Sequence, residues 1–160
     1  MDNDKTKNLK NKKLKICIVC SAGGHLTEIK LLEDLYKKWD HFFITFKRNN
    51  SINLSKKEKV YFIKDPSRNP ISLLITTIQT LVILLKEKPD LIISNGAGVA
   101  IPACYIAKLI GKKVIFIESF CRMEPSLSGK FAYPVADLFL VQYPQLKKEY
   151  KKAVYTGSLI

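Results

Sequence analysis

One of only two histidines in the chain follows two adjacent glycines, in the stretch Ser21-Ala22-Gly23-Gly24-His25. The glycines join a predicted strand to a predicted helix. Glycine lets the backbone approach a ligand closely, and the N–H groups of a first helical turn attract anions. The imidazole of His25 can bind or transfer a proton near neutral pH. The stretch is neither GxGxxG nor a P-loop, so these residues alone favour a small anion site no more than a plain tight turn.

A second glycine turn and a carboxylate follow two later apolar runs. The turn is Asn95-Gly96-Ala97-Gly98 and the carboxylate is Glu118, with Arg122 four residues further on. Two glycine turns at one edge of a sheet indicate anion binding more strongly than either turn alone. The competing interpretations are structural. Glu118 would form an ion pair with a nearby lysine or arginine, and Arg122 would be a solvated loop charge.

Apolar runs alternate with segments of helical periodicity along the whole chain. Strands are predicted over residues 14–20, 41–46, 60–63, 91–94, 114–118, 137–141 and 153–155. Helices are predicted over residues 26–39, 71–85 and 144–150 and from a turn containing Pro102 to Gly111, with a polar loop over 47–58. This alternation favours a Rossmann-like, doubly wound α/β fold with a mostly parallel sheet. Ligands of such folds bind beyond the carboxyl ends of the strands, where both glycine turns and Glu118 are expected.

Two of the predicted helices carry specific expectations. In the helix over residues 26–39, Glu28 lies off the apolar face and is expected away from the core. The helix over residues 71–85 is mostly apolar, and its polar side chains form a narrow uncharged stripe, so we expect it to be buried against the sheet. The alternative is partial embedding in a membrane interface, helped by Arg68, Lys86 and Lys88 at its ends. The segment is too short to span a bilayer.

The 160 residues, 47% of them hydrophobic, suit one globular domain, which we place at residues 14–160 behind a disordered basic arm at residues 1–13. The net charge of +13 favours nucleic acid, an anionic membrane surface or a phosphorylated substrate as partner, unless it is only a solvated lysine surface. The absence of a signal peptide predicts a cytoplasmic protein. Cys17 and Cys20 point to opposite faces of a strand, and no ligand cluster suggests a metal.

Several stretches spread over residues 14–160 resemble one group of glycosyltransferases. They are Ser21-Ala22-Gly23-Gly24-His25, Arg68-Asn69-Pro70, Lys88-Pro89-Asp90, Asn95-Gly96-Ala97-Gly98 with Pro102, and Ile117-Glu118-Ser119. The most specific block comprises Ser128-Gly129-Lys130, Tyr133-Pro134, Ala136-Asp137-Leu138-Phe139, Val141-Gln142-Tyr143-Pro144 and Tyr155-Thr156-Gly157-Ser158-Leu159. Together they are similar to the Alg-fourteen (Alg14) family, the acceptor-side subunits of a two-chain transferase that adds the second N-acetylglucosamine to dolichol-pyrophosphate. More distantly, the chain resembles the N-terminal half of the MurG-type transferase.

The resemblance implies the acceptor-binding half of a GT-B glycosyltransferase, with a separate Alg-thirteen-like subunit that binds the UDP-sugar donor. It implies a polyprenyl-pyrophosphate-linked saccharide as acceptor and a place in bacterial capsule or exopolysaccharide biosynthesis. The chain is then one subunit of an enzyme, inactive or weakly active alone, with no cofactor besides the donor substrate. A lysine-rich arm stands where the eukaryotic subunit has a membrane anchor, which favours peripheral attachment to the inner face of the cell membrane.

Glycosyl transfer requires a base near the acceptor hydroxyl and positive potential near the acceptor pyrophosphate. The resemblance favours His25 as the catalytic residue, and Glu118 is the second candidate for accepting the proton or orienting the acceptor. The expected acceptor- and phosphate-binding residues are Gly23, Gly24, Asn95, Gly96, Gly98 and Arg122.

Two other functions stay open at this level. One is a non-catalytic scaffold that recruits and stabilises a catalytic partner at the membrane. The other is a basic Rossmann-like module that binds a nucleotide or nucleic acid, which the net charge supports. Against it stand the lack of GxGxxG and the scarcity of arginine, the usual phosphate and base reader, so the leading interpretation expects no nucleic acid.

Overall fold

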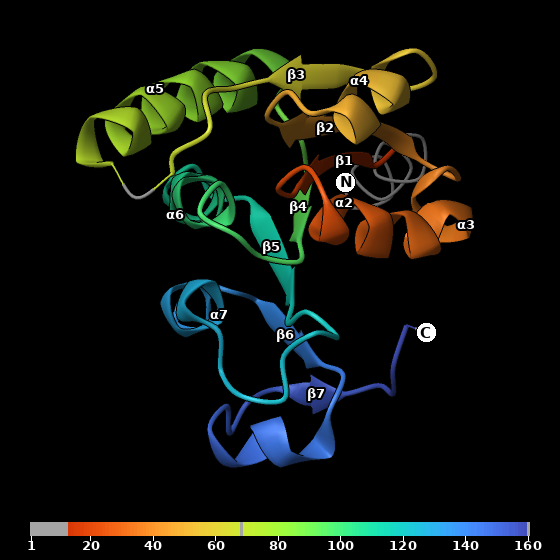
Figure 1. The fold of residues 1–160 in the computed structure, drawn as a ribbon, viewed down its shortest axis with the longest axis vertical. Coiled ribbons are helices and arrows are strands. Elements are labelled where there is room, and N and C mark those ends of the chain that lie inside the picture. Colours follow the sequence, from red (N-terminus) through yellow and green to blue (C-terminus); the bar gives the residue numbers. More distant parts are fainter. Residues whose placement is uncertain (1–12, 68, 160) are drawn as a thin grey trace, which may run out of the picture.

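Residues 13–67 and 69–159 are described by the computed structural model, and they contain one seven-stranded parallel sheet. The predicted arm at residues 1–13 lies almost wholly outside the described residues, as does Arg68. The strands are β1 (Lys15–Val19), β2 (Asp40–Thr45), β3 (Val60–Phe62), β4 (Leu91–Ser94), β5 (Lys113–Ile117), β6 (Leu138–Val141) and β7 (Val154–Tyr155). Their order across the sheet is β3-β2-β1-β4-β5-β6-β7 (Figure 1).

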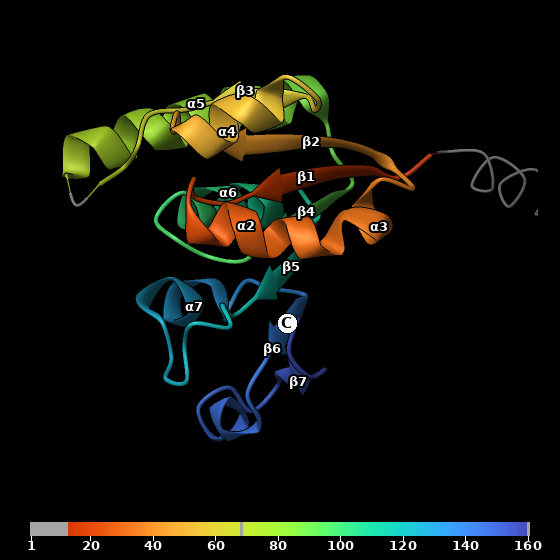
Figure 2. The same cartoon turned by 45° about the vertical axis from the view of Figure 1, so that its right-hand side comes forward.

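Helices cover both faces of this sheet. They are α2 (Gly24–Ile29), α3 (Glu33–Tyr36), α4 (Asn49–Ser55), α5 (Pro70–Glu87), α6 (Ala100–Leu109) and α7 (Leu127–Ala132), with the 3-10 helices η1 (Lys30–Leu32) and η2 (Pro144–Lys148). Figures 1 and 2 show α2 on one side of β4 and α6 on the other. Side chains of β1 and of the residue that follows it pack in two separate cores, one on each face of the sheet. Cys17 packs on the α6 side and Cys20 on the α2 side. The predicted opposite orientation of these two cysteines is confirmed.

The strand order reverses at β1, which pairs in parallel with β2 on one side and β4 on the other. This is the switch point of a doubly wound fold, where the loops after β1 and β4 diverge to opposite faces and leave a crevice. Both glycine turns follow these two strands. The predicted Rossmann-like parallel fold is therefore confirmed, and the structure places the two turns on either side of its crevice.

Two predicted segments differ from the structure. Residues 47–58 were expected to form a loop, but they contain α4, because Ser51 accepts a hydrogen bond from the Arg48 N–H (2.9 Å) and donates to the Phe46 carbonyl (2.8 Å). The buried side chain of Leu54 then packs α4 on the α2-side core. The helix expected over residues 26–39 is instead split into α2, η1 and α3.

Helix α5 is oriented opposite to the expectation that it would be buried. Its threonines Thr76 and Thr80 are fully buried, whereas Ile71 is 69% exposed and Leu74 is 60% exposed. Part of the polar stripe bonds the segment after the edge strand β3. Thr76 Oγ1 donates to the Lys64 carbonyl (2.7 Å) and the Gln79 side chain accepts from the Lys64 N–H (2.8 Å).

Among the described residues, α5 is the one helix long and apolar enough to cross a membrane by length and composition. Only 28% of that segment is buried inside the protein, and most of its large apolar side chains point outward, whereas Ile83 and Leu84 pack in the core. The helix has 18 residues, so the expectation that this segment is too short to span a bilayer is not borne out by its length.

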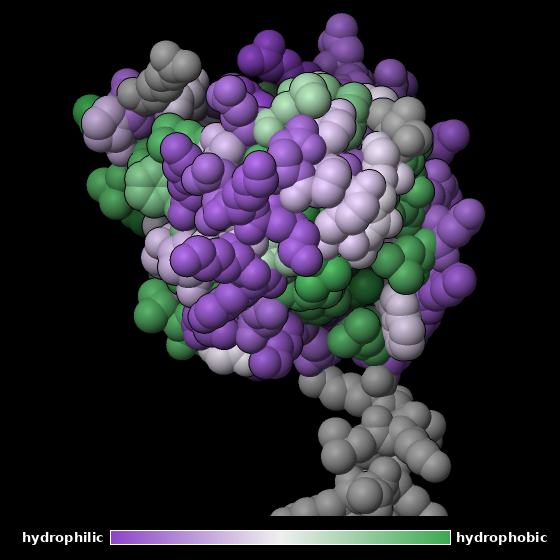
Figure 3. All heavy atoms as spheres, turned by 90° about the horizontal axis from the view of Figure 1, so that it is seen from below, coloured by the Kyte–Doolittle hydropathy of each residue, from purple (hydrophilic) through white to green (hydrophobic). Residues whose placement is uncertain are grey.

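Much of the positive charge lies at the surface. Around η2 and β7, Lys147, Lys148, Lys151 and Lys152 are exposed. Figure 3 shows the molecule from this end, where hydrophilic side chains cover a large area beside smaller apolar patches.

Candidate functional site

A pocket of about 500 Å³ opens at the carboxyl ends of β1, β4 and β5. Five of the predicted site residues line it: Gly24, His25, Gly98, Glu118 and Arg122. The rest of the lining comes from the start of α7, the first turn of α6, the two loops after β4 and β5, and Ser67. The two glycine turns and the carboxylate are separated by 20 to 94 positions in the sequence (Gly24, Gly98 and Glu118). They therefore meet at one site, as parallel-sheet topology requires.

The other three predicted residues lie behind or beside this pocket. Gly23, with a φ of 109°, borders a neighbouring hollow together with Lys47 and Arg48. Gly96 lies directly against the imidazole, because a Cβ built there would be 3.2 Å from His25 Cε1. Asn95 is fully buried, and its side-chain amide donates to the His25 carbonyl (2.7 Å). A role for these three in binding an acceptor stays a prediction.

The ring of His25 lies with one edge inside the protein and one toward the pocket. Its Nδ1 atom is buried without a hydrogen-bond partner among the described residues, although the side chain as a whole is 30% exposed. Burial lowers the pKa of His25 below its usual value, outweighing the opposite effect of the nearby Glu28 carboxylate. A neutral imidazole at neutral pH is the form that can accept a proton.

Glu28 is the neighbour of His25 that the sequence did not reveal. Its side chain is 1% exposed, so the expectation that it lies away from the core is wrong. Its carboxylate accepts hydrogen bonds from the Phe120 N–H (2.8 Å), the Gln142 side chain (2.6 Å) and the Asn95 side chain (3.1 Å). The sequence signal that could have found it is its position three residues after His25, which places both side chains on one face of a helix.

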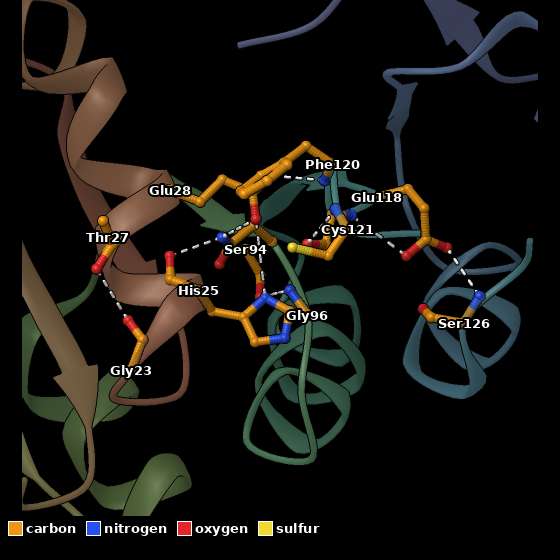
Figure 4. Close-up of polar contacts among 12 residues, drawn as sticks. Gly23, His25, Thr27, Glu28, Ser94, Gly96, Glu118, Phe120, Cys121 and Ser126 are labelled. Carbon is orange, nitrogen blue, oxygen red and sulfur yellow. Dashed lines mark hydrogen bonds and ion pairs between the residues drawn. The ribbon is translucent and has the colours of Figure 1, made fainter. Parts of the chain in front are cut away.

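Glu118 is also buried, at 1% exposure, and it faces the start of α7 (Figure 4). Its Oε2 atom accepts from the Tyr150 hydroxyl (3.1 Å) and the Ser126 N–H (3.3 Å). The alternative of an ion pair for Glu118 is therefore wrong: among the described residues, its hydrogen bonds come from neutral donors. Burial, and then the charge of Glu118, raise the pKa of Tyr150.

Arg122 supplies an exposed cation at the pocket. Its backbone N–H donates to the Ser119 carbonyl (3.0 Å), which closes a tight turn after β5. Within the described residues no ion pair holds the Arg122 guanidinium, which can approach an anionic ligand bidentately, as arginine does with phosphate. Over the described part of the chain, no group of three or more histidine, cysteine, aspartate or glutamate side chains could hold a metal ion.

Comparisons with known families and proteins agree on one group. A family model described as "Oligosaccharide biosynthesis protein Alg14 like" matches residues 63–159. The human protein named "UDP-N-acetylglucosamine transferase subunit ALG14" is 33% identical over 180 aligned positions, which cover 92% of this chain and 83% of the human one. A fission-yeast (Schizosaccharomyces pombe) protein of the same name is 47% identical over a shorter stretch, 43% of this chain and 36% of its own.

Solved structures share the fold at low sequence identity. Acinetobacter baumannii MurG superposes with a TM-score of 0.75 at 17% identity, over 91% of this chain and 45% of MurG. UDP-N-acetylglucosamine 2-epimerase from Rickettsia bellii gives a TM-score of 0.75 at 14% identity, over 92% of this chain and 46% of its own. The chain thus spans less than half the length of these proteins, and the likeness concerns the fold.

Proposed function

Because this chain belongs to the Alg14-like family, we propose that it is the acceptor-binding subunit of a glycosyltransferase. The reaction moves a sugar from a UDP-sugar to a polyprenyl-pyrophosphate-linked saccharide. The observation that carries the proposal is the pocket at the switch point, in which His25 lies beside two glycine turns and the exposed Arg122. It offers a proton acceptor and anion-binding groups within one site.

In the proposed reaction, the acceptor hydroxyl oxygen attacks the anomeric carbon of the donor sugar. The bond from that carbon to the nucleotide diphosphate breaks, and UDP leaves with the electron pair. The hydroxyl proton passes to Nε2 of His25, whose pKa is lowered by burial so that the ring starts neutral. The new glycosidic bond and a protonated imidazole are the products on this subunit.

The pyrophosphate of the acceptor would lie against the glycine turns. Gly24 and Gly98 are exposed on the pocket, so backbone N–H groups in this part of the site are accessible to phosphate oxygens. Arg122 adds a charge-assisted contact from the opposite loop. No resident cofactor or metal takes part in this proposal, since the UDP-sugar is a substrate.

The donor sugar would be bound by a second polypeptide, an Alg-thirteen-like subunit. The relatives are named as subunits of a transferase, which supports a shared enzyme. In this arrangement the two chains face each other across the crevice, one holding the acceptor and the other the donor.

The outward apolar face of α5 would hold the protein on the inner face of the cell membrane. Ile78 and Leu74 are more than half exposed there, and Lys86 and Lys88 follow at the end of the helix. Helices α5 and α6 pack together, and α6 begins at the pocket, so a bilayer on α5 would lie near the acceptor's lipid. A lipid-linked capsule or exopolysaccharide intermediate in a bacterium is the acceptor we propose.

The experiment measures sugar transfer from UDP-N-acetylglucosamine to a synthetic polyprenyl-pyrophosphate-linked sugar, with each chain alone and with the assembled pair. We expect turnover by the pair and little or none by either chain. Robust turnover by this chain alone would contradict the acceptor-subunit proposal. A pair that assembles but transfers no faster than its parts would contradict it as well.

A non-catalytic scaffold is the second candidate, and the hydrogen bonds of Glu118 favour it. The Glu118 carboxylate already accepts hydrogen bonds from Ser126 and Tyr150 within the chain, as a structural group would. If the scaffold role holds, His25→Ala and Glu118→Ala leave turnover by the assembled pair intact. A large fall in kcat with unchanged assembly would exclude it.

A further inference from the structure

We propose that Glu28 is the positioning residue for His25: its buried carboxylate keeps the ring proton on Nδ1, so that the lone pair of Nε2 faces the pocket. The catalytic consequence rests on the function proposed above, but the effect on the ring does not. Within a histidine, the partner of one nitrogen decides which nitrogen carries the proton, and hence whether the other can act as a base.

The geometry of the pair supports this assignment. The Nδ1 atom of His25 lies 4.0 Å from Oε2 of Glu28, and Figure 4 shows the ring with this edge toward the carboxylate. Nδ1 is the buried ring atom without a hydrogen-bond partner in the described structure. A movement of about 1 Å would close a hydrogen bond, and such contacts often tighten only when substrate binds.

The carboxylate is held in place by three segments besides its own helix. Asn95 follows β4, Phe120 follows β5, and Gln142 follows β6, and each donates an N–H to Glu28. Because every one of these neighbours donates, the carboxylate acts as an acceptor on all sides. A group fixed in this way can orient a flexible neighbour, as outer groups orient histidines at other sites.

The charged groups that face His25 are few. Glu28 lies on its own helix, while Glu118 and Arg122 act from the loop after β5. Glu118 directs its carboxylate toward Ser126 and Tyr150, and Arg122 carries no acceptor. Glu28 is therefore the carboxylate placed to accept a hydrogen bond from Nδ1–H of His25.

The substitution Glu28→Gln tests the assignment with almost no change in shape. The carboxamide oxygen can still accept from Phe120 and Gln142, which places the NH2 group where Oε2 was, facing Nδ1 of His25. An NH2 group there donates to Nδ1 and moves the ring proton to Nε2, where it blocks proton acceptance. The hydrogen bond from the Asn95 side chain to Oε2 is lost in this variant. Glu28→Asp retains the charge one methylene further back and serves as the second variant.

Nitrogen-15 NMR of the histidine rings in the tag-free full chain reads the proton position directly. The chain has two histidines, and His41, with its ring on the Trp39 carbonyl and Glu58, is the internal control. We expect neutral His25 to carry its proton on Nδ1 in the wild type and in Glu28→Asp, and on Nε2 in Glu28→Gln, with the His41 signals unchanged. The same His25 tautomer in wild type and Glu28→Gln would overturn the proposal.

Kinetics of the assembled pair separate positioning from a merely structural role. We expect Glu28→Gln to lower kcat about 100-fold with little change in KM for the acceptor, and to have no further effect in a His25→Ala background. An equal loss on both backgrounds would overturn the proposal, because Glu28 would then act without His25. If the tautomer changes but no variant alters turnover, the Glu28–His25 coupling stands and the base role in the proposed function fails.

Discussion

Buried carboxylates are held in opposite ways at the two ends of the parallel strands, here called the amino edge and the carboxyl edge of the sheet. At the amino edge, Glu87 accepts hydrogen bonds from Lys15 (2.6 Å) and Lys59 (2.9 Å), and from Tyr61. At the carboxyl edge, Glu28 and Glu118 are more deeply buried, yet they receive neutral N–H and O–H donors. The same residue type is thus neutralised by cations on one edge and left without them on the other.

At the amino edge, the cations lower the pKa values of the carboxylates that they contact. Burial alone would raise the pKa of Glu87, but hydrogen bonds from two lysines and a tyrosine outweigh it and lower the pKa to about 2. Asp137, also at the amino edge, is held by Lys108 and Lys113 with its pKa lowered to about 2. These carboxylates stabilise the fold. An unneutralised carboxylate beside an imidazole costs stability, and such costs are typical of functional sites.

The largest contrast is expected between the two histidines, one at each edge. His25→Ala should lower kcat of the assembled pair by about 100-fold or more, with an unchanged melting temperature, because it removes the proton acceptor. His41→Ala, the matched control, should keep kcat and lower stability, since His41 bonds Trp39 and Glu58 at the amino edge. Steady-state kinetics and thermal melts measure kcat and the melting temperature of both variants. A loss of kcat in His41→Ala equal to or larger than that in His25→Ala would contradict the comparison.

Gly129→Ala tests how tightly Glu118 is held at the carboxyl edge. A Cβ at residue 129 would lie 2.1 Å from Glu118 Oε2 and 2.7 Å from the Tyr150 hydroxyl, so the carboxylate must shift. We expect a loss of about 1–3 kcal/mol in the free energy of unfolding, measured with urea, and a lower kcat/KM for the acceptor. Gly24→Ala has no atom within 4 Å of its new Cβ and is the stability control. Equal stability of the two variants would show that Glu118 is not held as described.

Glu87→Gln tests the ion pairs of the amino edge through the pH dependence of the free energy of unfolding. A carboxylate with a lowered folded pKa stabilises the protein above its unfolded pKa, and this stabilisation is lost as pH falls toward about 2. The variant should lose about 1–3 kcal/mol at pH 7 and show a flatter decline between about pH 4.5 and pH 2. The measurement is urea unfolding across that range. Parallel curves for wild type and variant would mean that the ion pairs contribute nothing.

The smallest effect is expected outside both edges, on α5. Leu74→Glu should weaken binding to anionic lipid vesicles about fivefold without changing stability, because Leu74 is 60% exposed on the outward apolar face. Leu35→Glu, at a leucine 50% exposed on α3, should bind vesicles as the wild type does. Sedimentation with vesicles measures both. Equal weakening by the two substitutions would point to net charge rather than to the α5 face.

The parallel fold and the position of the site were predictable from sequence. Continuous apolar strands fix a parallel sheet, and that topology alone brings Gly24, Gly98 and Glu118 to one edge. The orientation of α5 was not predictable from its composition. Thr76 and Gln79 of this helix bond the backbone of Lys64, which follows the edge strand β3. The need of that backbone for partners is not visible until the strand order is known.

The polar groups behind the pocket were also beyond sequence analysis. Helical periodicity placed Glu28 off the apolar face, but its partners Asn95, Phe120 and Gln142 lie 67 to 114 positions away along the chain. A buried carboxylate becomes favourable only when such distant donors converge on it. Local sequence patterns cannot predict that convergence. The three-residue spacing between His25 and Glu28 indicates only that the two side chains share one face of a helix.

The central claim is that the carboxyl edge, and not the amino edge, receives the lipid-linked acceptor. The most direct measurement titrates a short-chain prenyl-pyrophosphate-linked N-acetylglucosamine into the chain while NMR follows its two histidine rings. We expect the signals of His25, on the pocket, to shift and those of His41 to stay in place. An unmoved His25, or equal shifts of both rings, would contradict the claim.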